Sequence, residues 1–156
     1  MFVRCSGVLA AALLTLAAPA AAQPAPQLKL ESITARLLYT SSGALSDNIA
    51  PPAEFTLFNT VIGEGDAAEP ANDVLVSAIV TSRDAQANGT EPLTLVVRDE
   101  GGKVLARRVF DSIFVDGARS VSSVLVQDVA CVGPVTIEAT MGRQRLTTSL
   151  DFACGE

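Results

Sequence analysis

The sequence predicts an all-β domain, and three observations support this prediction. Apolar side chains recur with a period of two along most of the chain, which is typical of half-buried strands. No stretch after the N-terminal leader combines helical periodicity with helix-capping residues. Turn residues separate the short apolar runs from one another. Together these features favour an immunoglobulin-like antiparallel β-sandwich of about seven to eight strands, preceded by a cleavable signal peptide.

Residues 1–22 have the order of a secretory signal peptide. Arg4 supplies a positive charge, an apolar run covers residues 7–18, and three alanines at 20–22 precede a cleavage site before Gln23. The apolar run is shorter than the roughly 20 residues that a membrane span needs, and no later segment is long enough either. We therefore expect a periplasmic or extracellular protein with no membrane span after cleavage.

The mature chain begins with residues 23–28, an extended lead in which Pro24 and Pro26 disfavour a helix. The following residues, 29–156, have the length of a single domain that can bury a hydrophobic core. Loss of Arg4 with the leader takes the formal net charge from −6 to −7. This acidity disfavours contact with a phosphate backbone, so no nucleic acid partner is expected.

Eight runs have the alternation or the β-branched composition of strands. They cover residues 33–39, 55–62, 74–82, 93–98, 104–110, 121–127, 135–141 and 146–152. Residues 99–103, with glycine at 101 and 102, form the expected hairpin loop between the fourth and fifth runs, because glycine permits the positive φ of such loops.

A long loop, residues 40–52, follows the first of these runs. Leu45 and Ile49 can attach it to the core, and two prolines at 51 and 52 stiffen its exit. We expect the loop to cover a sheet edge and block unwanted strand pairing. The alternative is a role in recognition, in which the loop would be the inhibitory wedge of a small secreted protease inhibitor.

The last two runs predict their own register. A two-residue turn at Gly142-Arg143 pairs residues of the two antiparallel strands whose numbers sum to 285. Because side chains alternate along each strand, every second pair lies on the same face. In this register one face of the hairpin is apolar and the other is polar. Cys131 then lies opposite Cys154, so we expect a disulfide between them with a structural role. A redox role would require a Cys-x-x-Cys-like arrangement, which this pair lacks.

Catalytic residues are scarce in this composition. The chain has no histidine, so Ser–His and Cys–His pairs and most zinc sites are excluded. One tyrosine and no tryptophan leave little aromatic surface for a glycosidase cleft. We therefore expect a non-catalytic protein without a resident cofactor.

An acidic loop over residues 63–73 is the strongest candidate for a ligand site. It contains Glu64, Asp66, Glu69 and Asp73 within a glycine-containing connection. Calcium takes several oxygen ligands from carboxylates and carbonyls, which flexible loops can supply, although the spacing does not match an EF-hand.

The favoured function is therefore an exported, non-catalytic β-sandwich module with a structural role or a protein partner. Such a module would bind through its loops or through a sheet edge. The alternatives are a calcium- or carbohydrate-binding module that uses residues 63–73, and the protease inhibitor described above.

Overall fold

The computed structural model describes residues 28–155, and the predicted signal peptide and most of the proline-rich lead lie outside this range. One short 3-10 helix, η1 (Thr60–Ile62), interrupts a chain built from strands. Within residues 28–155, no helix is long and apolar enough to cross a membrane. The strands are β1 (Leu28–Tyr39), β2 (Ala71–Ser82), β3 (Gln86–Gly89), β4 (Leu93–Asp99), β5 (Val104–Phe110), β6 (Ile113–Asp116), β7 (Arg119–Val126), β8 (Gly133–Met141) and β9 (Gln144–Phe152).

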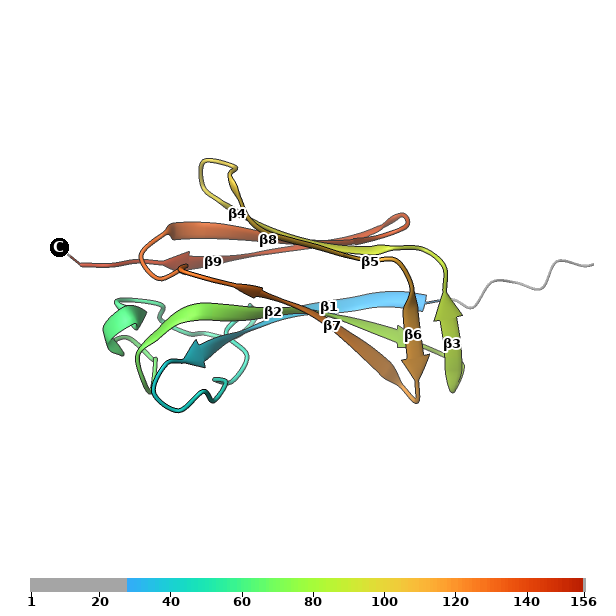
Figure 1. The fold of residues 1–156 in the computed structure, drawn as a ribbon, viewed down its shortest axis with the longest axis horizontal. Helices are drawn as coiled ribbons and strands as arrows, with labels where there is room; N and C mark the ends of the chain where they lie inside the picture. The colour runs from blue at the N-terminus through green and yellow to red at the C-terminus, as the bar shows by residue number, and fades with distance from the viewer. Residues whose placement is uncertain (1–27, 156) are drawn as a thin grey trace, which may run out of the picture.

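The strands form two antiparallel sheets, as the period-two pattern predicts. One sheet has the order β1-β2-β7-β6-β3 and the other has the order β5-β4-β8-β9. Figure 1 shows the two sheets as stacked layers, with β3 and β6 bent across one end of the stack. This immunoglobulin-like sandwich confirms the predicted fold class.

The core lies between the layers and is filled by the alternating inward side chains of both sheets. Leu37 and Val76 come from the five-stranded sheet, and Leu95, Ile137 and Phe152 come from the four-stranded sheet; all five side chains are almost fully buried. The predicted hairpin register is confirmed, since Ala139 pairs with Leu146 and every pair along this ladder sums to 285. The apolar face of the hairpin therefore faces the core.

The predicted strand over residues 55–62 is wrong. Phe58 makes one isolated bridge to Ala153, and the chain then turns into η1. Asn59 has a φ of 46°, in the left-handed region, which breaks the extended backbone. Val61 and Ile62 consequently face solvent instead of the core.

Two strands, β3 and β6, were not predicted. Each has four residues, and β3 is Gln-Ala-Asn-Gly, a composition more typical of a turn than of a strand. Their pairing with each other, from Gln86–Asp116 to Gly89–Ile113, supplies the extended structure that local propensity does not. β1 also begins at Leu28, one residue before the predicted start of the domain.

The long loop at residues 40–52 covers the outer edge of β1, as predicted. Ser46 N–H donates to the Leu37 carbonyl oxygen (3.0 Å), and Ile49 N–H donates to the Ala35 carbonyl oxygen (2.8 Å). The Ser46 hydroxyl in turn accepts a hydrogen bond from Leu37 N–H (2.9 Å). Ile49 is buried as expected, whereas Leu45 is 42% exposed and does not attach the loop to the core. The loop therefore satisfies main-chain groups that another strand could otherwise use.

Candidate functional site

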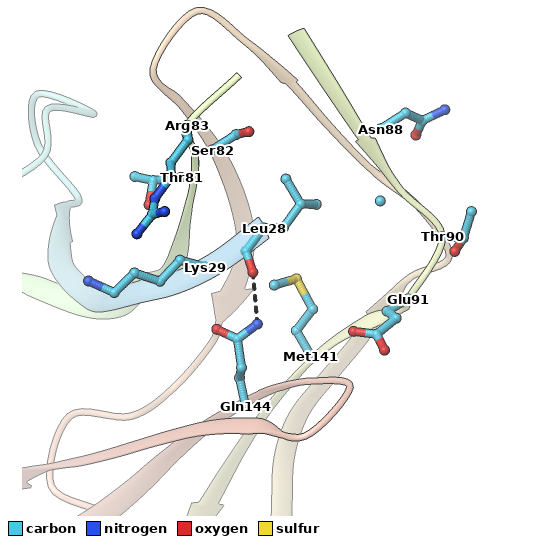
Figure 2. Close-up of a pocket in the computed structure, with 11 residues that line it drawn as sticks. Leu28, Lys29, Thr81, Ser82, Arg83, Asn88, Thr90, Glu91, Met141 and Gln144 are labelled. Carbon is cyan, nitrogen blue, oxygen red and sulfur yellow. Dashed lines mark hydrogen bonds between the residues drawn. The ribbon is translucent and has the colours of Figure 1, made fainter. Parts of the chain in front are cut away.

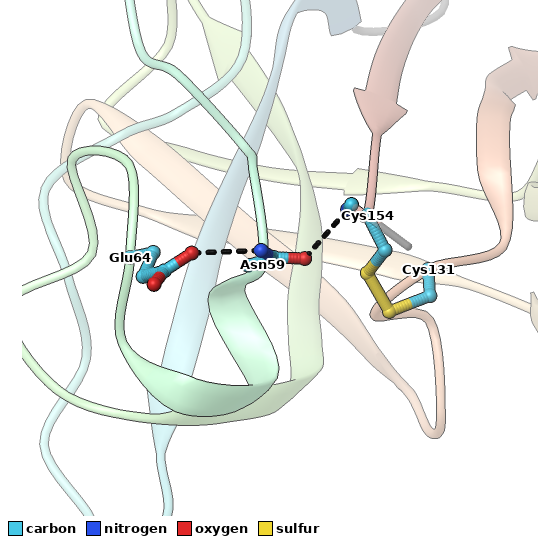
Figure 3. Close-up of a disulfide and its surroundings, with 5 residues drawn as sticks. Asn59, Glu64, Cys131 and Cys154 are labelled. Atoms are coloured by element: carbon cyan, nitrogen blue, oxygen red, sulfur yellow. Dashed lines mark hydrogen bonds between the residues drawn. A yellow bond between two sulfur atoms is a disulfide. The ribbon is translucent and has the colours of Figure 1, made fainter.

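The disulfide between Cys131 and Cys154 is present, with a Cα–Cα distance of 5.0 Å. Figure 3 shows it joining the segment before β8 to the segment after β9. Both cysteines are exposed, and they lie two residues beyond the Gly133–Phe152 pair that ends the ladder. The predicted pairing is confirmed, and the bond extends the last hairpin covalently. Its structural role stays a prediction, which the disulfide variant described in the Discussion tests.

Asn59 fastens the loop before η1 to the C-terminal segment. Its side-chain Nδ2 donates to Glu64 Oε2 (2.7 Å), while its Oδ1 accepts from Gly155 N–H (2.9 Å), next to Cys154 (Figure 3). Its main-chain N–H also donates to the Ala153 carbonyl oxygen (2.9 Å). Sequence reasoning missed this residue, although asparagine is one of the few non-glycine residues that tolerate a left-handed φ.

Replacing Asn59 separates its backbone role from its side-chain role. We expect Asn59→Ala to lower the free energy of unfolding by about 1–2 kcal/mol, because alanine resists the left-handed backbone and cannot make either side-chain hydrogen bond. Asn59→Gly keeps the backbone conformation and should cost clearly less. Chemical denaturation of both variants measures the difference, and equal losses would contradict the backbone part of this explanation.

The acidic loop does not gather its four carboxylates. In the part of the chain that the structure covers, no three acidic or other metal-ligating side chains lie close enough to hold one ion. Each carboxylate instead accepts a hydrogen bond from a different donor: Glu64 from Asn59 Nδ2 (2.7 Å), Asp66 from Thr56 N–H (2.7 Å), Glu69 from Ser42 N–H (3.2 Å) and Asp73 from Asp128 N–H (3.0 Å). Calcium binding stays a prediction, which thermal unfolding with calcium and with a chelator would test.

Asp66 closes the loop onto Thr56 through two hydrogen bonds. Besides the carboxylate contact, Asp66 N–H donates to the Thr56 carbonyl oxygen (3.1 Å). The preceding Gly65 has a φ of +68°, and a Cβ there would lie 2.4 Å from the same carbonyl oxygen, so glycine is required. Hydrogen bonding from Thr56 lowers the pKa of the Asp66 carboxyl below its ordinary value of 3.8.

The lowered pKa of Asp66 makes a small part of the stability dependent on pH. A depressed pKa in the folded state stabilises the protein above pH 3.8, and this contribution is lost as the pH falls through the folded-state pKa. In Asp66→Asn a neutral oxygen replaces the carboxylate. We expect the wild type to be more stable than Asp66→Asn at pH 7 and this difference to shrink below pH 3.8. Urea unfolding between pH 7 and pH 3 measures it, and a constant difference would contradict the assignment.

A hollow of about 770 Å³ lies at the end of the sandwich where β1 begins. In Figure 2, Leu28 and Met141 form its apolar part, and Gln144 donates a hydrogen bond to the Leu28 carbonyl oxygen (2.9 Å). Among the described residues that line the hollow, Glu91 is the one carboxylate and none is aromatic. These described lining residues supply neither the two carboxylates of a glycoside hydrolase nor an aromatic stacking surface.

The outer edge of β9 is an edge of the four-stranded sheet that the described residues leave open. At the end of this strand, Ala153 N–H donates to the Leu57 carbonyl oxygen (3.0 Å), so its main chain points away from β8. Because main-chain direction alternates along a strand, residues 145, 147, 149 and 151 point the same way. Within residues 28–155, their N–H and C=O groups make no hydrogen bond. We call these groups of Arg145, Thr147, Ser149 and Asp151 the β9 edge.

The opposite end of the same sheet is protected in a different manner. β5 contains Arg107 and Arg108, and Arg108 pairs with the buried Leu95, so its side chain faces the other layer. There its guanidinium donates to the Ser123 carbonyl oxygen (3.2 Å) and lies 4.8 Å from the centre of the Phe110 ring. An inward-pointing charge is a known means of discouraging strand addition. β9 has no such charge on its inward face.

The β9 edge was not predicted as a site, and neither was the end hollow. The two loops that the sequence suggested as sites lie elsewhere in the structure. The four carboxylates of the acidic loop accept hydrogen bonds from four different donors and do not converge. The loop at residues 40–52 lies along β1, and hydrogen bonds hold its middle residues there. This arrangement favours the edge-covering role of the loop over the projecting wedge of an inhibitor.

Comparisons with known proteins identify no family for this chain. No protein-family model matches it, and no curated protein matches it either. Among solved structures, the chain is similar to a Bifidobacterium dentium β-glucuronidase complexed with coumarin-3-O-glucuronide, with 14% identity and a TM-score of 0.42. The match covers 83% of this chain but 18% of that chain. A likeness of this degree carries no argument about function.

Proposed function

We propose that this chain is an exported, non-catalytic module that binds a protein partner by strand addition along the β9 edge. The observation that carries the proposal is the run of outward main-chain donors and acceptors at residues 145, 147, 149 and 151. An exposed edge of this kind accepts an extended segment through main-chain hydrogen bonds, while alternate side chains provide specificity. The loop along β1 and the inward Arg108 of β5 make these two edges less accessible to such a partner than the β9 edge.

Two features support export. The leader at residues 1–22 has the charge, apolar run and small residues of a signal peptide. The chain also has a Cys131–Cys154 disulfide, and such bonds form and persist in oxidising compartments such as the periplasm or the extracellular space. Export can be tested by expressing the full chain in a bacterium and sequencing the N-terminus of the periplasmic product. A product that begins at Gln23 is expected, and an unprocessed chain retained in the membrane would contradict the proposal.

Composition supports a non-catalytic role. The chain contains no histidine, and the two cysteines of the predicted mature chain are joined to each other. The common nucleophile–base pairs therefore cannot form, and binding is the activity that the remaining surface favours.

Site-specific photo-crosslinking tests strand addition in cells that export the chain. The photoreactive amino acid p-benzoylphenylalanine is placed at position 147 or 149 on the β9 edge, or at position 109 on β5 as a control. Val109 is 42% exposed, so the control is accessible to solvent. A discrete adduct from positions 147 and 149 but not from 109 is expected. No adduct, or equal adducts from all three positions, would contradict the proposal.

A further inference from the structure

We infer that the partner of the β9 edge is a second copy of this chain, paired antiparallel with its centre at Thr148. The inference rests on the proposed function, because it identifies the occupant of the same edge. Three independent features of β9 support it: the charges at its ends, the direction of its main-chain groups, and the limits of its open stretch.

The sequence of the open stretch is complementary to itself when it is reversed. Residues 145–151 read Arg-Leu-Thr-Thr-Ser-Leu-Asp. Antiparallel pairing about Thr148 places Arg145 of one copy opposite Asp151 of the other, and the two-fold axis creates this contact twice. Directly opposite positions in antiparallel strands are close enough for such charges to attract each other. Leu146 meets Leu150 on the inward face in the same register.

The side chains needed for these contacts are accessible. Arg145 and Asp151 are both exposed on the outer face of the sheet. The Asp151 side chain makes no hydrogen bond or ion pair with any residue in the described range. Arg145 has one contact, a 3.5 Å ion pair with Glu138 on the neighbouring strand, and its side chain is 67% exposed. Each copy can therefore offer one charge of each sign to its partner.

Main-chain geometry permits the same register. Antiparallel strands exchange hydrogen bonds between residues whose main-chain groups point toward each other. On the β9 edge these are the odd-numbered residues, and pairing about Thr148 matches 145 with 151 and 147 with 149. A shift of one residue would pair odd with even positions and leave the outward groups unmatched. Pairing about Thr148 therefore brings opposite charges together and also lets the outward main-chain groups of the two copies form hydrogen bonds.

The open stretch also has its midpoint at Thr148. It begins after the Gly142-Arg143 turn and ends before Ala153, where the main chain is occupied by Leu57 and Asn59. Pairing about Thr148 uses the whole stretch in both copies. The two four-stranded sheets would join through β9 into one continuous eight-stranded sheet. β5 could not pair with itself in this manner, because its central residues, Arg107 and Arg108, would face each other in two copies.

The experiment is sedimentation equilibrium of the mature chain from micromolar to millimolar concentration, with charge variants on the β9 edge. We expect a monomer–dimer equilibrium in the wild type. Arg145→Glu and Asp151→Arg should each raise the dimer dissociation constant by about tenfold or more, since each turns two attractive contacts into repulsive ones. The double variant R145E/D151R should restore affinity to within about threefold of the wild type.

Controls separate the edge from general charge effects. Arg119→Glu makes the same charge change at an exposed position on β7, in the other sheet, and should leave the dissociation constant unchanged. Asp151→Arg keeps the test valid if Arg145→Glu unfolds the protein through its contact with Glu138. A wild type that remains monomeric, or a dimer insensitive to the edge variants, would overturn the inference. In that case a photo-crosslinked adduct of different mass at position 147 would still support strand addition by another protein.

Discussion

Removing the Cys131–Cys154 disulfide is expected to lower the free energy of unfolding by about 3 kcal/mol, according to the chain-entropy model for a loop of this length. The cysteines are separated by 23 positions in the sequence, and both are exposed. Serines in their place would remain solvated, so C131S/C154S adds no penalty for a buried polar group. Thermal unfolding should show a decrease in Tm of about 10 °C for a domain of this size.

The control for this variant is the wild type under reducing conditions. Reduction and C131S/C154S should lower Tm by similar amounts, because both remove the same covalent link. A variant as stable as the oxidised wild type would indicate that Asn59 and the β8–β9 ladder hold the C-terminal segment without covalent help. The disulfide would then have no structural role of the expected size.

Truncating Phe152 is expected to destabilise the domain more than any other single substitution proposed for this protein. Its side chain is 2% exposed at the end of β9, in the inward row that also contains Leu150. Phe152→Ala removes a large apolar side chain and leaves a cavity that rigid neighbouring strands fill incompletely, at a cost of about 3–5 kcal/mol. Urea unfolding measures this loss directly.

Phe114 is the matched control, since it is 57% exposed on β6. Phe114→Ala should change the free energy of unfolding by about 0.5 kcal/mol or less, as is usual for surface positions. Similar losses at positions 114 and 152 would contradict the assignment of the inward face of β9. The comparison therefore also tests the register that brings Cys131 and Cys154 together.

Much of the sandwich could be predicted because its strands follow the period-two pattern. The β8–β9 hairpin is the clearest case, since Gly142-Arg143 and the two cysteines define the register independently of each other. Prediction failed where local composition and tertiary context disagree. Residues 55–62 are apolar enough for a strand, but the left-handed Asn59 and the bridge to Ala153 turn the chain instead.

The candidate site depended more strongly on tertiary structure. The hairpin register already implies that the main chain of Thr147 points away from β8. Sequence alone could not show whether another strand occupies that side, because the covering of an edge is decided by segments distant along the chain. The loop at residues 40–52 covers β1 and not β9, and only the fold reveals this choice.

Amide hydrogen exchange of the dilute mature protein tests the open β9 edge most directly. The amides of Arg145, Thr147, Ser149 and Asp151 should exchange rapidly. Those of Leu146, Thr148 and Leu150, which bond to β8, should exchange more slowly, on the order of a hundredfold or more. This alternation is the result expected of an edge with no internal partner. Uniformly slow exchange along residues 145–151 would show that the edge is already occupied, and would contradict both strand addition and self-pairing.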